Sequence, residues 1–157
     1  MKRFAIRAMG GTMLLLAIIV PARAADAPND REALSGLKTA RAVFDVRAPD
    51  RERMIFNLEL IKETAEGMAA QRVKPKMIVT FRGPGIRLLT REQAADELAP
   101  LISELKGMGV RFEVCTVATR IFKVDKATIL PEIVLVGNSL ISLIGYQNRG
   151  YALVILM

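Results

Sequence analysis

The apolar positions of this chain follow two periods, one typical of β-strands and one typical of α-helices. Short apolar runs rich in Val and Ile predict five strands, at residues 42–46, 76–81, 111–115, 133–136 and 151–156. After the first run, apolar residues recur at spacings of four and three, which predicts a helix whose stripe is Met54, Leu58, Ile61, Ala65 and Met68. A second stripe predicts another helix, through Ala94, Leu98, Leu101, Ile102 and Leu105.

Residues that favour helix ends agree with this pattern. Asp50 is placed to cap the first helix, and Thr90 with Gln93 forms a capping box for the second. Pro100 lies inside the second stripe and predicts a kink or two helical pieces. Asn138 and Ser139 predict the start of a short third helix. The segment 116–122 is interpreted as a loop or a helical turn.

Strands separated by helices predict an α/β fold, a three-layer α/β/α arrangement with a mainly parallel five-stranded sheet. Right-handed crossovers place the carboxyl ends of parallel strands on one rim, where ligands of such folds bind. This rim would gather Arg47, residues 82–86, residues 115–119 and residues 137–139. The order of the strands does not follow from the pattern.

The first residues have the features of an export signal. Basic side chains near the start precede an apolar run at 13–20, Pro21, and small residues at Ala22 and Ala24. We therefore expect a cleavable signal peptide at 1–24, with an uncleaved anchor as the alternative, and a periplasmic or secreted protein. A polar, aperiodic stretch at 25–40 is interpreted as a flexible leader, which leaves 41–157 as the folded domain.

The composition excludes several classes of partner and of catalytic or metal site. The 157 residues hold 23 Lys and Arg against 16 Asp and Glu, and loss of four basic residues with the signal peptide leaves 19 − 16 = +3. The basic residues alternate with acidic ones along the sequence, so we expect no nucleic-acid partner. The absence of His and the single Cys exclude His-dependent catalysis and a multi-Cys metal site. No metal, no cofactor and no membrane contact after signal cleavage are expected.

Cys115 is the candidate functional residue. It ends the third predicted strand, and strand alternation places it on the same face as Arg111 and Glu113. Backbone N–H groups of the following turn, with Arg120 close in sequence, would stabilise its thiolate and make it a nucleophile or a sulfur carrier. The alternative is a buried Cys that only fills core space. Idle free thiols are uncommon in oxidising compartments, which favours a functional role.

Other rim residues also allow two interpretations. The loop containing Gly83 and Gly85 would present N–H groups to an anion, or would simply be a turn. Asn138 and Ser139 would contact a ligand, or would only cap the helix. Asp45 would be a buried acid near the site, or would lie toward the exposed end of its strand.

Three segments resemble those of a known family. The stretch Leu105–Cys115 resembles the "L-K-x-x-G-V-x-F-x-V-C" segment of the DsrE/DsrF-like sulfur-relay proteins. Residues 141–152 resemble their terminal "L-x-x-L-Q-x-x-G-Y-A" segment, and residues 80–86 lie where that family has a "V-x-x-G-x-G-I/V" loop. The similarity covers about 41–157, in the same order and spacing. It implies an α/β domain that assembles into trimers or hexamers and carries sulfur as a persulfide on Cys115.

Together these observations predict a periplasmic sulfur carrier that accepts sulfane sulfur on Cys115 and passes it to a partner thiol. The expected binding residues around it are Arg82, Gly83, Gly85, Thr116, Arg120, Asn138 and Ser139. The expected partners are further copies of the chain and a thiol-bearing protein. The alternatives are a non-catalytic oligomeric module that binds a small anion or a protein, and a redox-sensing thiol.

Overall fold

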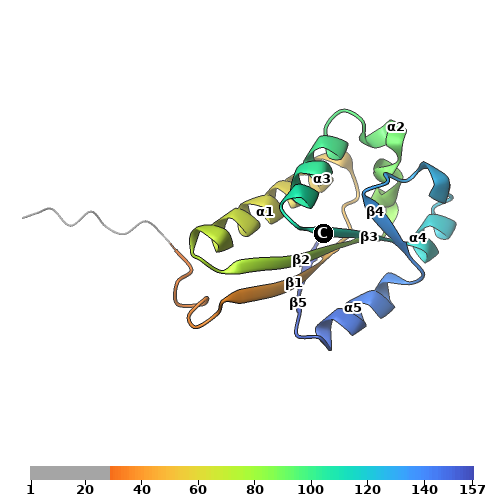
Figure 1. Ribbon diagram of the computed structural model, residues 1–157. Helices are drawn as coiled ribbons and strands as arrows, with labels where there is room; N and C mark the ends of the chain where they lie inside the picture. Colours follow the sequence, from red (N-terminus) through yellow and green to blue (C-terminus); the bar gives the residue numbers. More distant parts are fainter. Residues whose placement is uncertain (1–28) are drawn as a thin grey trace, which may run out of the picture.

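The computed structural model describes residues 29–157, and the predicted signal peptide at 1–24 lies outside the described residues. Five parallel strands form one sheet in the order β4-β3-β2-β1-β5. The strands are β1 (Thr39–Val46), β2 (Lys74–Phe81), β3 (Arg111–Cys115), β4 (Ile133–Val136) and β5 (Ala152–Leu156). Helices lie on both faces of the sheet (Figure 1), which confirms the predicted α/β class.

The main core lies on the face of the sheet that is covered by α1 (Arg51–Ala70) and α3 (Leu98–Gly107). Alternate residues of β1 and β2, such as Phe44 and Phe81, point into it and meet the predicted apolar stripes of both helices. Phe81 and Phe112 stack across neighbouring strands with ring centroids 5.9 Å apart. Packing of these helices therefore holds β1, β2 and β3 in position, and with them the residues at the carboxyl ends of these strands.

The opposite face of the sheet is covered by α5 (Ser139–Gln147) and has a much smaller apolar core, formed by Val43, Ile78 and Leu143. A buried polar row crosses this face because Asp45 is paired with Thr80, and Thr80 with Glu113, in the strand register. The sheet is thus asymmetric, with polar groups concentrated under α5.

Helix boundaries follow the capping residues. The Asp50 side chain accepts a hydrogen bond from the Arg53 N–H at 2.8 Å, and Thr90 accepts one from the Gln93 N–H. The second predicted helix is two pieces, α2 (Arg91–Ala94) and α3, and Pro100 lies in the first turn of α3, where a missing N–H costs little. The segment after β3 forms a short helix, α4 (Thr116–Ile121). Two 3-10 helices, η1 (Pro84–Leu89) and η2 (Lys126–Thr128), complete the chain.

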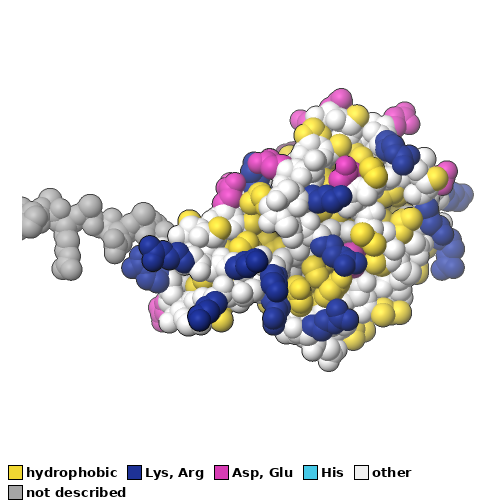
Figure 2. Space-filling model, viewed as in Figure 1, with side chains coloured by type: hydrophobic (Ala, Val, Ile, Leu, Met, Phe, Trp, Pro, Cys, Tyr) yellow, Lys and Arg dark blue, Asp and Glu magenta, His cyan; other side chains and the backbone are white. Residues whose placement is uncertain are grey.

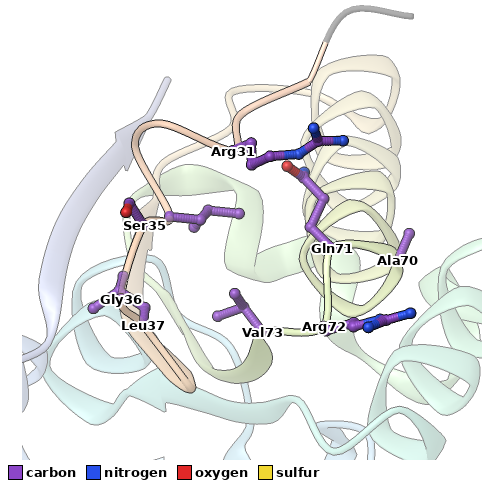
Figure 3. A pocket seen from close by; sticks show the side chains of 9 residues that line it. Arg31, Ser35, Gly36, Leu37, Ala70, Gln71, Arg72 and Val73 are labelled. Atoms are coloured by element: carbon purple, nitrogen blue, oxygen red, sulfur yellow. The ribbon is translucent and has the colours of Figure 1, made fainter. Parts of the chain in front are cut away.

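The strand β1 begins at Thr39, inside the stretch predicted as a leader, and residues 31–36 before it form turns. These turns are tied to the end of α1, because the Asp30 N–H donates to Gln71 Oε1 at 3.1 Å. A cavity separates the two segments (Figure 3), with Val73 pointing into it and Arg72 pointing away. This cavity lies at the amino end of β2, away from Cys115.

Candidate functional site

A cavity of about 230 Å³ lies at the carboxyl ends of β2 and β3 and contains Cys115 in its lining. Residues after β2, the helix α4 and the start of α5 surround it, as expected for the rim of a parallel sheet. Its lining is Arg82, Gly83, Cys115, Val117, Ala118, Ile121, Phe122, Asn138, Ser139 and Leu140. Five residues predicted from the sequence to act together therefore do meet, namely Arg82, Gly83, Cys115, Asn138 and Ser139.

The Cys115 thiol lies in a pocket of hydrogen-bond donors. The Ser139 N–H donates to Cys115 Sγ at 3.4 Å, at the start of α5. Burial raises the pKa of Cys115, but the Ser139 hydroxyl and the N–H groups of Ser139, Ala118 and Val117 outweigh it and bring the pKa below its usual value. The Ser139 hydroxyl is buried and meets no acceptor at full hydrogen-bond geometry, so a thiolate is the acceptor that would satisfy it. The site favours a charged sulfur.

Arg82 contributes positive charge beside the thiol. A Cys115 thiolate is close enough to raise the pKa of Arg82, although the largest cause is the hydrogen bond from Arg82 to Asp45. Arg82 donates from Nε to Asp45 Oδ1 and from a terminal nitrogen to Oδ2, both at 2.7 Å. Arg47 donates to Asp45 Oδ2 at 3.0 and 2.7 Å. One buried carboxylate thus orients two guanidinium groups, which leaves a net positive charge at the rim.

Three predicted binding residues lie outside this cavity. Gly85 is buried in η1, where an added Cβ would lie 2.2 Å from the Ala48 carbonyl oxygen, so its role here is steric. The Thr116 hydroxyl donates to the Gly137 carbonyl at 2.9 Å and links β3 to the loop before α5. Arg120 is exposed on α4 and does not line the cavity. Arg82, which follows β2 and is also predicted as a binding residue, supplies the positive charge at the cavity.

The mouth of the cavity is apolar, which the sequence analysis missed. Ile121 is 62% exposed and Leu140 is 49% exposed, and both line the opening. Cys115 itself is only 4% exposed, so a reactant must enter through this opening. The signal was present in the sequence, because Ile121 and Leu140 each follow closely on a strand end, but strand order was needed to bring α4 and α5 together.

Neither a group of metal ligands nor a membrane-spanning helix is found in the described part of the chain. Within residues 29–157, no three Cys, Asp or Glu side chains come together as ligands for a metal ion. No helix in the same range is long and apolar enough to cross a membrane.

The sequence and the fold of this chain are similar to those of known proteins. The chain is 28% identical over 124 residues to an uncharacterized protein of Aquifex aeolicus (strain VF5), covering 73% of this chain and 55% of that protein's length. A solved structure of a protein of unknown function from Methanobacterium thermoautotrophicum has the same fold, with a TM-score of 0.63 and 24% identity, covering 74% of this chain and 98% of that one. Residues 16–156 match the DsrE/DsrF-like family, and the chain belongs to that family.

Proposed function

We propose that this protein is an exported sulfur carrier that holds sulfane sulfur as a persulfide on Cys115. The observation that carries the proposal is the surrounding of Cys115 Sγ, where N–H groups from two helices and the Ser139 hydroxyl lower the pKa of the thiol. A thiolate is the reactive form in sulfur exchange. Membership of the DsrE/DsrF-like family supports the same chemistry.

The transfer needs no outside oxidant. The Cys115 thiolate attacks the outer sulfur of a donor persulfide, R–S–SH, so that one S–S bond forms as another breaks and the donor leaves as the thiolate R–S⁻. An acceptor thiolate then attacks the outer sulfur on Cys115 and leaves with the persulfide, which restores the Cys115 thiolate. Arg82 and the N–H groups stabilise negative charge on either sulfur of the bound persulfide.

The volume of the cavity and its apolar mouth limit which sulfur donors and acceptors can reach Cys115. About 230 Å³ holds a small persulfide or the tip of a protein loop that carries a Cys, and the apolar mouth at Ile121 and Leu140 suits contact with a protein surface. We propose a thiol-bearing partner protein on this basis. The signal peptide predicted at 1–24 would place the exchange in the periplasm.

The test is to incubate the purified protein with glutathione persulfide, remove the excess and measure the mass of the peptide that contains Cys115. The expected result is a gain of about 32 Da, one sulfur atom, that a reductant removes. The matched control is Cys115→Ser, which keeps the size of the side chain and should gain nothing. An unmodified Cys115 after this treatment would contradict the proposal.

A second candidate is a non-catalytic module that binds a small anion, and the arginine pair held by Asp45 favours it. Arg82 lines the cavity, and Arg47, which follows β1, shares the Asp45 carboxylate with it, so an anion in the cavity would meet both a guanidinium and helix N–H groups. In this case sulfite or sulfate would protect Cys115 from alkylation, and the persulfide would not form.

A further inference from the structure

A second pocket lies on the α5 face of the sheet, at the opposite end of the strands from Cys115. Strand alternation directs Lys74, Lys76 and Arg111 to the face that also carries Glu113. The helix α5 ends at Gln147 and leaves the amino ends of β2 and β3 uncovered. These basic residues come from distant parts of the sequence, so their clustering arises only in the fold.

This basic pocket has a volume of about 440 Å³, within the range of small-molecule sites. Its polar lining is cationic, with Lys74 and Lys76 from β2, Arg111 from β3 and Arg149 from the turn after α5. Tyr146 and Tyr151 provide its aromatic lining, and the remaining wall is Pro75, Met77, Ile78, Met108 and Gly109. The pocket thus combines several cations with two aromatic rings.

The positive charge of the basic pocket is largely uncompensated. Among residues 29–157, Lys74, Lys76 and Arg149 take part in no ion pair, and Arg111 pairs with Glu113 at 3.1 Å. Figure 2 shows Lys and Arg side chains gathered around an apolar area on the face formed by β1, β2 and α5. Cations held together without counter-ions attract anions, and a concave surface strengthens the attraction.

The two tyrosines give the pocket an apolar component. Their ring centroids lie 5.3 Å apart with the planes tilted by 57°. The Tyr146 hydroxyl donates to Glu113 Oε1 at 2.5 Å, which fixes the ring against the sheet, and burial with this bond raises the pKa of Tyr146 to about 12. A rigid, uncharged ring beside lysines is the surface on which a planar ligand ring would stack.

We propose that the basic pocket binds a small organic anion that combines a phosphate-type group with an aromatic ring, as in a nucleotide. The phosphates would contact Lys74, Lys76 and Arg149, and the ring would lie against Tyr146 and Tyr151. Arg111 and Cys115 are at opposite ends of β3, about 13 Å apart along the strand. The two sites are therefore distinct, and this proposal stands independently of sulfur transfer.

The test is calorimetric titration of the purified protein with ADP, pyrophosphate and adenosine. ADP should bind more tightly than pyrophosphate or adenosine, because only ADP supplies both the charge and the ring. The double variant Lys74→Gln/Lys76→Gln should weaken ADP binding by about tenfold or more, since it removes two phosphate contacts. The matched control, Lys123→Gln/Lys126→Gln, changes the same charge away from the pocket and should leave the affinity unchanged. Cys115→Ser should also bind ADP normally.

Several results would overturn the proposal. One is the absence of saturable ADP binding, and another is an equal loss of affinity in the two double-lysine variants. Binding of pyrophosphate as tight as that of ADP would remove the aromatic part of the assignment. A single-stranded oligonucleotide that binds more tightly than ADP, with a steep dependence on salt, would assign the pocket to nucleic acid instead.

Discussion

At the scale of single residues, Ser139 lowers the pKa of Cys115 and so favours its reactive thiolate form. It supplies two of the donors that lower the pKa of the thiol, its N–H and its hydroxyl. Ser139→Ala keeps the N–H and removes the hydroxyl, so the pKa of Cys115 should rise, because the thiolate loses one hydrogen-bond donor. The pH dependence of the rate of alkylation by iodoacetamide measures this shift.

Ser142→Ala is the matched control for this measurement, since Ser142 is on the same helix but does not line the cavity. It should leave the alkylation profile of Cys115 unchanged. If Ser139→Ala gave the same midpoint as the wild-type protein, the hydroxyl would have no role in stabilising the thiolate.

Asp45 should contribute to the pH dependence of the free energy of unfolding, because its pKa differs between the folded and unfolded states. Burial raises the pKa of Asp45, but hydrogen bonds and charge from Arg82 and Arg47 outweigh it, so its pKa in the folded state lies below the usual value. A carboxyl with a lowered pKa stabilises the fold above its unfolded pKa of about 3.9, and this contribution disappears as the pH falls through the folded pKa. Asp45→Asn should therefore lower the free energy of unfolding by about 2 kcal/mol or more at pH 7.

Urea unfolding at pH 7 and at pH 3 tests this prediction. The difference between the wild-type protein and Asp45→Asn should shrink at the lower pH, because pH 3 lies below the unfolded pKa of this carboxyl and the stabilisation by its charge falls from there. Asp96→Asn, at an exposed position outside any ion pair found in residues 29–157, should change little at either pH. A difference that stays constant with pH would show that the charge of Asp45 does not contribute.

At the scale of elements, η1 is shaped by Gly85. A Cβ at this position would meet the Ala48 carbonyl oxygen at 2.2 Å and the end of Met54 at 3.0 Å. Because the first neighbour is backbone and cannot rotate away, Gly85→Ala should lower the free energy of unfolding by about 1–3 kcal/mol. Gly67→Ala is the contrasting variant, since it lies in α1 with open space around it and should stabilise the protein by up to about 1 kcal/mol. Thermal unfolding of both variants checks these opposite signs.

The elements also show which features of the structure can be predicted from the sequence and which cannot. The observed bounds of β3 and β4 are those predicted, and the second predicted helix is two pieces, α2 and α3, which is one of the two outcomes that Pro100 indicated, because these signals are local. The pairing of Asp45 with Arg82 could not be predicted, since it depends on β1 lying beside β2 in the sheet. Arg82 and Arg120 are both predicted from the sequence as binding residues, but only Arg82 lines the cavity, because the fold and not the distance along the sequence determines which charge lies beside the thiol.

At the scale of the whole molecule, we propose a homo-oligomer, because large apolar side chains are exposed on one face of the sheet. Ile141 is 69% exposed and Ile144 is 59% exposed on α5, and Ile155 is 51% exposed on the edge strand β5. A monomer gains nothing by exposing such side chains together with an unpaired strand edge. The family resemblance implies a trimer or hexamer, and the α5 surface is the part of the molecule that would be buried in it.

Ile141→Glu should therefore weaken the assembly, because it places a charge where an apolar contact would form. Light scattering coupled to size-exclusion chromatography should give a mass of several chains for the wild-type protein and a lower mass for the variant. Phe56→Glu, at an exposed apolar position on α1 across the sheet, is the matched control and should keep the wild-type mass. A wild-type mass of one chain would contradict the oligomer, and a variant that keeps the full mass would move the interface away from α5. Because α5 also supplies Ser139 to the thiol pocket, an interface on this helix would bring a second chain close to the mouth of the sulfur site.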